Sequence, residues 1–318
     1  MKRELFCKGY TWGWCSRKGD YLKPCADSSL RELKEMGAEW VAICFDLTQD
    51  TFASTRIYFD YSRTVTDLDI INAVRMAKDI GFKVCLKPVV NPADGVWRQY
   101  INFPDEAPQY WDQWFKSYTD AMVHYADLAQ YLNCEMFCTG CEMGGADRKT
   151  DYWKKMLTTV REHYDGLLTY NFQYDRGINT EVCGELDAIG LSLYHPVGRV
   201  ADDVEGMVSE FRKVADDLKK IHDITKKPIL FMETGCVNGK GATKEPWAHQ
   251  FDENDEDEQE RFYKSIMEVF WDQEWFSGYF WWDWPSNLYP IEKANEIISF
   301  CIYGKKASAV LKDWYLNR

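Results

Sequence analysis

Two glutamates stand where a carboxylate is costly to bury. Glu142 follows the largely apolar stretch CEMFCTGC, and Glu233 follows the apolar run PILFM. An acidic side chain directly after a buried strand needs a compensating purpose, because an unpaired buried charge is expensive. Two such carboxyls are what hydrolysis of a glycosidic bond requires: one protonates the leaving oxygen, and the other attacks the anomeric carbon or activates water. Each glutamate alone could equally be a salt-bridged structural carboxylate.

The elements that would carry these residues alternate regularly along the chain. Short apolar runs, typical of strands buried on both faces, lie near residues 8–12, 39–45, 82–87, 134–140, 166–171, 187–193, 228–233 and 277–282. Amphipathic helical patterns cover 27–36, 67–80, 108–132, 150–163, 202–224 and 256–275, with a weaker pattern at 176–185 and a closing one at 306–316.

Eight strand–helix units without a Pro/Gly/Ser linker predict an α/β protein, a single-domain (β/α)8 TIM barrel over residues 1–318. An open doubly wound sheet would usually carry a Gly-rich turn after its first strand, and TWGWCSRKGDY does not match one. Functional side chains of a barrel gather at the C-terminal ends of its strands. Glu142 and Glu233 end the fourth and seventh strands, so we expect them to face one another across the barrel mouth.

Composition narrows the choice of partners. The formal net charge of −13 disfavours nucleic acid and anionic membrane surfaces, whereas a neutral sugar meets no such repulsion. No apolar stretch of 18 residues predicts a membrane span. The start MKRELFCKGYTW lacks the apolar core of a secretory signal, and several of the 11 cysteines lie in apolar runs, so we expect a cytoplasmic protein. The 14 Trp, 19 Tyr and 17 Phe suit either a core of large residues or platforms for sugar rings.

Two patterns that resemble metal sites are better explained by secondary structure. Cys134, Cys138 and Cys141 have no histidine at zinc-site spacing and fall in a predicted strand. The acidic run 252–260 lacks the Gly-centred loop of a calcium site and suits the start of a helix. We therefore expect no metal and no cofactor.

Six segments of the chain, in their order and spacing, resemble one family of glycosidases. They are VCLKPVVNPADGVWRQYI (84–101), WFKSYTDAMVHYADLAQ (114–130), MFCTGCEM (136–143), LDAIGLSLYHP (186–196), ILFMETG (229–235) and GYFWWDW (278–284). The chain is similar to glycoside hydrolase family 113, the β-mannanases among the clan A retaining glycosidases. The resemblance implies that Glu142 is the acid/base and Glu233 the nucleophile of a two-step mechanism, with transglycosylation as a side reaction and carboxyls about 5–5.5 Å apart.

The same resemblance implies further site residues. Tyr194 would hydrogen-bond to the nucleophile, the alternative being a rim tyrosine with its hydroxyl in water. Trp282 would form an aromatic floor under the sugar, extended by Trp284, although core packing explains alternate members of the run FWWDW equally well. Three residues of the third unit would line the sugar cleft: Lys87, Trp97 and Arg98.

Other candidates come from the residues alone. Asn171 ends the fifth strand and Gln49 follows the second, so either amide could contact sugar hydroxyls, or each could be a capping residue. His195, Trp12 and Trp14 are weaker candidates for sugar contacts.

Two positions depart from the family pattern. Cys141 stands where many clan A enzymes carry an asparagine that binds the sugar 2-hydroxyl, and a thiol is a poor substitute for an amide donor. Val89 stands where a polar residue is expected. We keep Cys141 as a candidate sugar contact and leave the sugar open between β-1,4-mannan or manno-oligosaccharides, and β-glucan, xylan or another short oligosaccharide. A carbohydrate-binding barrel without turnover is the third interpretation. The sequence predicts no oligomeric state.

Overall fold

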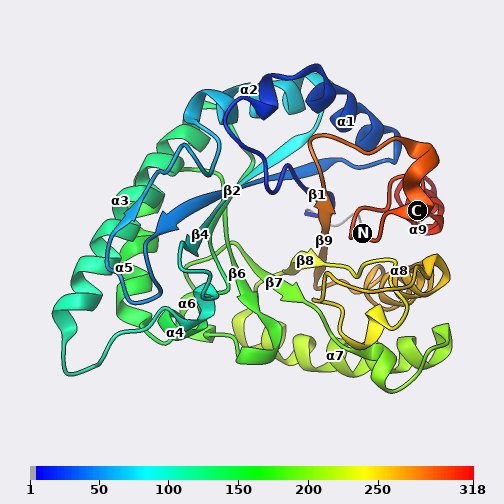
Figure 1. Ribbon diagram of the computed structural model, residues 1–318. Coiled ribbons are helices and arrows are strands. Elements are labelled where there is room, and N and C mark those ends of the chain that lie inside the picture. Colours follow the sequence, from blue (N-terminus) through cyan, green and yellow to red (C-terminus); the bar gives the residue numbers. More distant parts are fainter. Residues whose placement is uncertain (1–4) are drawn as a thin grey trace.

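Eight parallel strands close into a barrel in the computed structural model, which describes residues 5–318 (Figure 1). They are β1 (Cys7–Trp12), β2 (Trp40–Gln49), β4 (Lys83–Pro92), β5 (Met136–Cys141), β6 (Leu167–Gln173), β7 (Ala188–Leu193), β8 (Ile229–Thr234) and β9 (Phe276–Trp284). The barrel closes because β1 pairs with both β2 and β9. The two-residue strand β3 (Ile57–Tyr58) adds an antiparallel edge to β2. The predicted barrel is confirmed.

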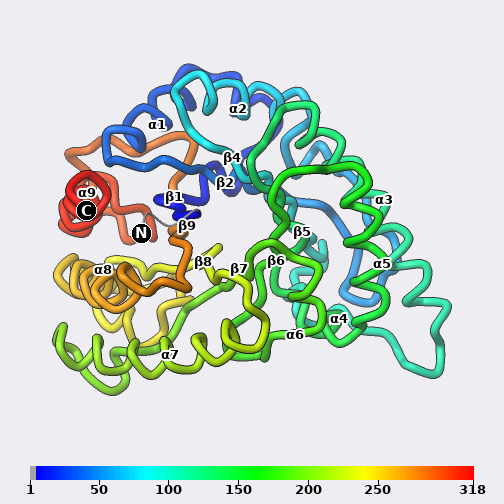
Figure 2. Tube along the Cα trace, turned by 180° about the vertical axis from the view of Figure 1, so that it is seen from behind, coloured from blue at the N-terminus to red at the C-terminus, as the bar shows by residue number. Residues whose placement is uncertain are grey.

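Helices surround the barrel, as Figure 2 shows from behind. They are α1 (Pro24–Glu35), α2 (Asp67–Ile80), α3 (Pro108–Tyr131), α4 (Gly144–Asp147), α5 (Thr150–Arg161), α6 (Thr180–Cys183), α7 (Val204–Thr225), α8 (Glu256–Phe270) and α9 (Lys306–Asn317). The weaker helical pattern over 176–185 corresponds to a shorter helix than predicted: a 3-10 turn ends at Arg176, and Asn179 caps the single turn α6. No helix among the described residues is long and apolar enough to cross a membrane.

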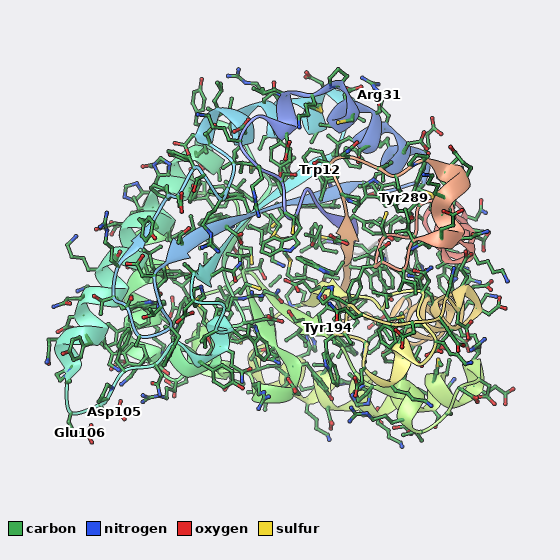
Figure 3. All side chains as sticks on the ribbon, in the orientation of Figure 1. Trp12, Arg31, Asp105, Glu106, Tyr194 and Tyr289 are labelled. Carbon is green, nitrogen blue, oxygen red and sulfur yellow. The ribbon has the colours of Figure 1, made fainter. Side chains whose placement is uncertain are left out.

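Aromatic side chains fill much of the space between the barrel and its helices (Figure 3). The fully buried tryptophans are Trp12, Trp40, Trp111, Trp114, Trp153, Trp281 and Trp284. A smaller cluster that includes Cys85, Cys138 and Phe280 forms a second part of the core. All eleven cysteines are free, and residues 5–318 contain no group of three or more His, Cys, Asp or Glu side chains placed to hold a metal ion. The burial of these seven tryptophans shows that many of the aromatic side chains belong to the core and do not form sugar platforms.

An extra residue precedes each of the two glutamates in its strand. The register pairs Cys138 with Thr169 and then Cys141 with Asn171 between β5 and β6, and it pairs Leu191 with Phe231 and then Ser192 with Glu233 between β7 and β8. In each pair one strand advances one residue more than its neighbour. Such a bulge turns the side chains that follow it, and bulges are common beside active sites. The two bulges therefore help to turn the side chains of Glu142 and Glu233 toward the barrel mouth.

Candidate active site

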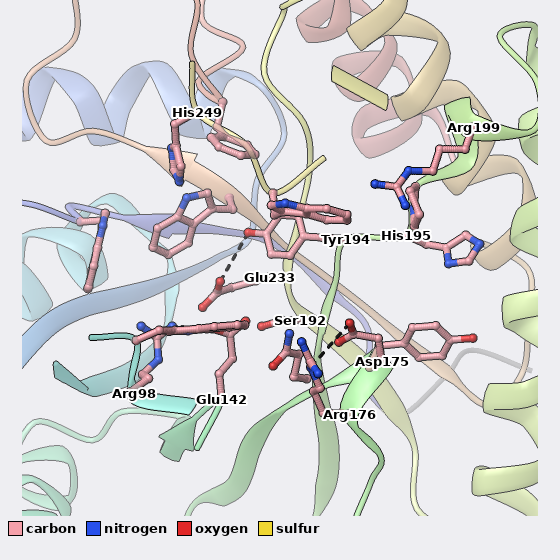
Figure 4. Close-up of a pocket in the computed structure, with 18 residues that line it drawn as sticks. Arg98, Glu142, Asp175, Arg176, Ser192, Tyr194, His195, Arg199, Glu233 and His249 are labelled. Atoms are coloured by element: carbon pink, nitrogen blue, oxygen red, sulfur yellow. Dashed lines mark hydrogen bonds and ion pairs between the residues drawn. The ribbon is translucent and has the colours of Figure 1, made fainter. Parts of the chain in front are cut away.

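The C-terminal ends of the strands surround a cavity of about 880 Å³ (Figure 4). Both Glu142 and Glu233 line it, together with Tyr194 and Trp282. Figure 4 shows the two carboxylates projecting into the same space from β8 and from the end of β5. The convergence predicted from the barrel geometry is therefore present.

Glu233 is the fifth of the six buried residues of β8, and it lines this cavity. Its Oε1 accepts hydrogen bonds from Lys87 Nζ at 2.6 Å, Asn171 Nδ2 at 3.1 Å and Cys141 Sγ at 3.3 Å. Among the described residues, Oε2 accepts only from the Tyr194 hydroxyl, at 3.4 Å (Figure 4). Three donors fill the accepting capacity of Oε1, so Oε2 is the oxygen left to react.

The charges around Glu233 favour its ionised form. Burial alone would raise the pKa of Glu233, but the positive charges of Lys87 and Arg98 hold it below its ordinary value. Lys87 is itself fully buried, so little water screens this ion pair. These charges therefore favour Glu233 as the ionised carboxylate of the pair.

Glu142 occupies a backbone conformation that few residues other than glycine adopt. Its φ is 52°, in the left-handed region, and its N–H donates to Asn171 O at 2.8 Å. Its Oε2 accepts from Arg98 Nη2 at 2.7 Å and from Trp97 Nε1 at 3.3 Å. The loop after β4 therefore holds the carboxylate from the side.

The pKa of Glu142 moves in the opposite direction to that of Glu233. Burial raises the pKa of Glu142, the charge of Arg98 opposes that effect, and the negative charge of Glu233 adds to it. A pair of carboxyls with opposite shifts separates a proton donor from an ionised partner. The arrangement suits Glu142 as the acid and Glu233 as the nucleophile.

An aromatic surface lies beside the two carboxylates. Trp282 lines the cavity, and Trp14 tilts against it with ring centroids 5.3 Å apart. Trp97 and Trp247 line the same cavity and are 37% and 47% exposed. Such faces offer the flat apolar contact that sugar rings favour.

Comparison with known proteins agrees with this geometry. The model of glycoside hydrolase family 113 matches residues 10–305. The chain belongs to glycoside hydrolase family 113. A solved GH113 β-mannanase, AaManA from Alicyclobacillus acidocaldarius in complex with ManMIm, is 36% identical over 98% of this chain and 97% of its own, with a TM-score of 0.90. A second GH113 β-1,4-mannanase is 34% identical over 99% of this chain and 100% of its own, also with a TM-score of 0.90.

More distant structures share the barrel. The β-glucuronidase of Ruminococcus gnavus is 16% identical, and the match covers 98% of this chain and 50% of that one with a TM-score of 0.65. This likeness shows the fold alone. No curated protein matched the sequence.

Three predicted sugar contacts of the family 113 chain lie outside the cavity. Trp12 and Trp284 are fully buried, and both indole N–H groups donate to Ser29 Oγ, at 3.2 and 3.1 Å. Gln49 is buried. Its Nε2 donates to Thr51 O, and its Oε1 accepts from the indole N–H of Trp114. The prediction that these three residues contact sugar is therefore wrong.

The error for Trp284 has a physical cause. Strict alternation would turn Trp284 to the same side as Trp282, away from Trp281. The register between β1 and β9 instead shifts, pairing Tyr10 with Trp281 and Trp12 with Trp284, so β9 contains an extra residue. Trp284 consequently packs outside the barrel, against α1.

Three other predicted residues lie beneath the cavity and contact the nucleophile candidate. Lys87, Asn171 and Cys141 are buried and contact Glu233 directly, which suits residues that hold a carboxylate in place. His195 does line the cavity, and burial lowers its pKa, which favours a neutral ring. Arg98 and Trp97 line the cavity and also hold Glu142.

Some cavity residues escaped prediction from sequence. Ser192 lines the cavity, and its hydroxyl donates to Asn171 Oδ1 at 3.3 Å. Alternation along β7 places it on the same face as Tyr194, which was a usable signal. Arg199 and Trp247 stand in long loops, where no period indicates the direction of a side chain.

Proposed function

We propose that this family 113 chain hydrolyses β-1,4-linked mannan and manno-oligosaccharides with retention of anomeric configuration. The observation that carries the proposal is the pair Glu142 and Glu233 in one cavity, with pKa values shifted in opposite directions. The two solved β-1,4-mannanases of the same family support the choice of sugar.

The first step forms a covalent glycosyl-enzyme. Glu233 Oε2 attacks the anomeric carbon while Glu142 donates its proton to the leaving oxygen. Lys87 keeps Glu233 ionised, and Tyr194 orients Oε2 through the 3.4 Å contact. We expect the two carboxyls to stand about 5–5.5 Å apart during this step, as retention requires.

The second step reverses these roles. Glu142, now ionised, takes a proton from water, and the water oxygen attacks the anomeric carbon and releases Glu233. A sugar hydroxyl in place of water gives transglycosylation. Arg98, 2.7 Å from Glu142 Oε2, stabilises the ionised form needed here.

The sugar itself is proposed to lie over Trp282, flanked by Trp14 and Trp97, with His195 as a polar contact. Cys141 and Asn171 both donate to Glu233 Oε1, so neither is free to act chiefly on substrate. The 2-hydroxyl therefore depends on other donors of the cavity, among which Ser192 is adjacent to Glu142.

A cytoplasmic location would suit imported oligosaccharides better than polymer, and we propose it because eleven free cysteines fit a reducing compartment. Cell fractionation with an antibody against the chain measures it. Recovery of a processed form outside the cell contradicts it.

The catalytic proposal is tested with Glu142→Ala and Glu233→Ala on mannohexaose, with cellohexaose beside it. Both variants should lose hydrolysis of mannohexaose, and azide added to Glu233→Ala should give the α-glycosyl azide. With 2,4-dinitrophenyl β-mannobioside, whose leaving group needs no proton, Glu142→Ala should still form the glycosyl-enzyme, and added azide should give the β-glycosyl azide. Glu135→Gln is the matched control, because Glu135 precedes β5 at the end of the strand opposite Glu142 and pairs with Lys78.

Three outcomes contradict the proposal. Wild-type rates in Glu233→Ala remove the catalytic assignment. An inverted first product of the wild-type enzyme, seen by proton NMR, removes the two-step mechanism. Hydrolysis of cellohexaose without hydrolysis of mannohexaose replaces mannan as the substrate.

A further inference from the structure

The segment that carries Glu142 is tied to β6 at two successive peptides. Glu142 N–H donates to Asn171 O at 2.8 Å, and Met143 N–H donates to the Tyr170 hydroxyl at 3.1 Å. The left-handed φ of Glu142 is a conformation that surrounding contacts must maintain. The second tie is made by a side chain, so a substitution can remove it.

The Tyr170 hydroxyl closes a ring of hydrogen bonds around this segment. It accepts from Met143 N–H and donates to Asp147 Oδ1 at 2.5 Å. Asp147 N–H in turn donates to Met143 O at 2.9 Å. Residues 143 and 147 are thus linked once through the backbone and once through Tyr170.

The ring of Tyr170 has no freedom to move away. It is buried and packs edge-on against Trp153, with centroids 4.9 Å apart. It also lies so close to Gly140 that a Cβ there would come within 2.5 Å of it. Trp153 Nε1 donates to Ala146 O at 2.9 Å, which fixes the same segment from its other side.

We propose that Tyr170 and Asp147 are positioning residues that hold Glu142 where it can protonate the leaving group. The proposal rests on the proposed role of Glu142 as the acid/base. Neither Tyr170 nor Asp147 lines the cavity, so neither contacts the sugar directly. Their effect must pass through the placement of Glu142.

A role of this kind has a signature that general damage to the fold lacks. A leaving group that needs a proton depends on the position of Glu142, whereas a 2,4-dinitrophenolate departs without one. The value of kcat/KM reports the first step for both kinds of substrate. We call the hydrogen bonds of Tyr170 to Met143 and Asp147 the clamp. Its loss should therefore lower kcat/KM for natural substrates and leave kcat/KM for activated substrates unchanged.

The experiment measures kcat/KM of Tyr170→Phe on mannohexaose and on 2,4-dinitrophenyl β-mannobioside. We expect a fall of about tenfold to a hundredfold on mannohexaose, because small misplacement of a catalytic group costs that much, and roughly unchanged values on the activated substrate. Asp147→Ala should behave like Tyr170→Phe. Asp147→Asn keeps an acceptor for the Tyr170 hydroxyl and should restore most of the activity.

Tyr164→Phe is the matched control. The Tyr164 hydroxyl is equally buried and donates to Cys134 O at 2.6 Å, before β5 and away from the cavity. It should lower the unfolding temperature without changing the ratio of the two kcat/KM values. Should Tyr170→Phe fail to fold by circular dichroism, the two Asp147 variants decide the matter.

Equal falls on both substrates, or an unchanged rate on mannohexaose in folded Tyr170→Phe, overturn the clamp. Glu142→Ala, measured in parallel, separates this failure from failure of the proposed function. If Glu142→Ala loses mannohexaose activity while Tyr170→Phe does not, only the clamp is wrong. If Glu142→Ala keeps that activity, the acid/base assignment itself is wrong.

Discussion

Replacing Lys87 with methionine should move the acid limb of the activity profile to higher pH. Lys87 Nζ lies 2.6 Å from Glu233 Oε1, and both side chains are buried. Methionine keeps most of the volume of the side chain but removes its charge. Arg98 then remains as the cation that offsets the burial of Glu233.

The size of the shift follows from Coulomb's law. Two unit charges 2.6 Å apart at an effective dielectric constant of about 20 interact by about 6 kcal/mol. At about 1.4 kcal/mol for each pKa unit, this sets an upper bound of about 4–5 units. Because Arg98 and the hydrogen bonds from Asn171 and Cys141 remain, we expect the pKa of Glu233 to rise by about 1–2 units.

The assay is kcat/KM against pH on an aryl β-mannobioside, because this parameter reports ionisation of the free enzyme. The nucleophile must be ionised, so a raised pKa of Glu233 displaces the acid limb upward and leaves partial activity at alkaline pH. Lys83→Met is the matched control, since Lys83 is exposed at the opposite end of β4. An acid limb of Lys87→Met that coincides with the wild-type limb would refute the electrostatic reasoning.

The same substitution has a consequence for stability. The folded-state pKa of Glu233 is lowered, so its pairing stabilises the fold above the unfolded pKa, and that stability is lost as pH falls through the folded value. An unpaired buried carboxylate costs about 3–5 kcal/mol. Lys87→Met should therefore unfold at lower denaturant concentration near neutral pH, and the difference from wild type should shrink in acid.

Three more variants test the remaining assignments. Tyr194→Phe should lower kcat/KM by about tenfold, since it removes a hydroxyl donated to the Glu233 carboxylate, and an unchanged value would exclude that contact from catalysis. Trp282→Ala should raise KM for mannohexaose by about tenfold, whereas Trp284→Phe should lower the unfolding temperature and leave KM unchanged; the reverse pattern would exchange their roles. Because the pKa of Glu142 is raised, kcat/KM on mannohexaose should fall on the alkaline side of a bell-shaped profile, and that limb should be absent on 2,4-dinitrophenyl β-mannobioside, whose leaving group departs without a proton.

Much of the barrel was predictable because each element has a local cause. Helix α2 was placed at its observed bounds, 67–80, since its start is a capping box of Thr66 and Asp69 and its end is Gly81 with φ 91°. The strand ends were harder. Strands β2 and β4 each run several residues past the predicted ends at 45 and 87, because they continue to pair with each other up to Gln49 and Pro92. Pairing between distant segments is not encoded in either segment alone.

The site was predictable where a residue's role follows from its place at a strand end. Glu142 and Glu233 follow this rule, since burying a carboxylate after an apolar strand costs free energy that only a specific role offsets. Trp284 shows the limit, because its direction depends on the extra residue in β9. An alternating pattern cannot reveal a bulge, which depends on the register with the neighbouring strand.

Cys141 on β5 and Asn171 on the adjacent strand β6 form one polar contact that the sequence did not reveal. From the sequence, a thiol before the acid/base leaves an amide donor missing. In the fold, Asn171 on β6 pairs with Cys141 on β5 and brings its Nδ2 within 3.2 Å of the sulfur and 3.1 Å of Glu233 Oε1. The amide on β6 therefore contacts the nucleophile candidate directly. Since Asn171 Oδ1 also accepts from Ser192, strands β5, β6 and β7 share one polar network beside Glu233, which no single motif contains.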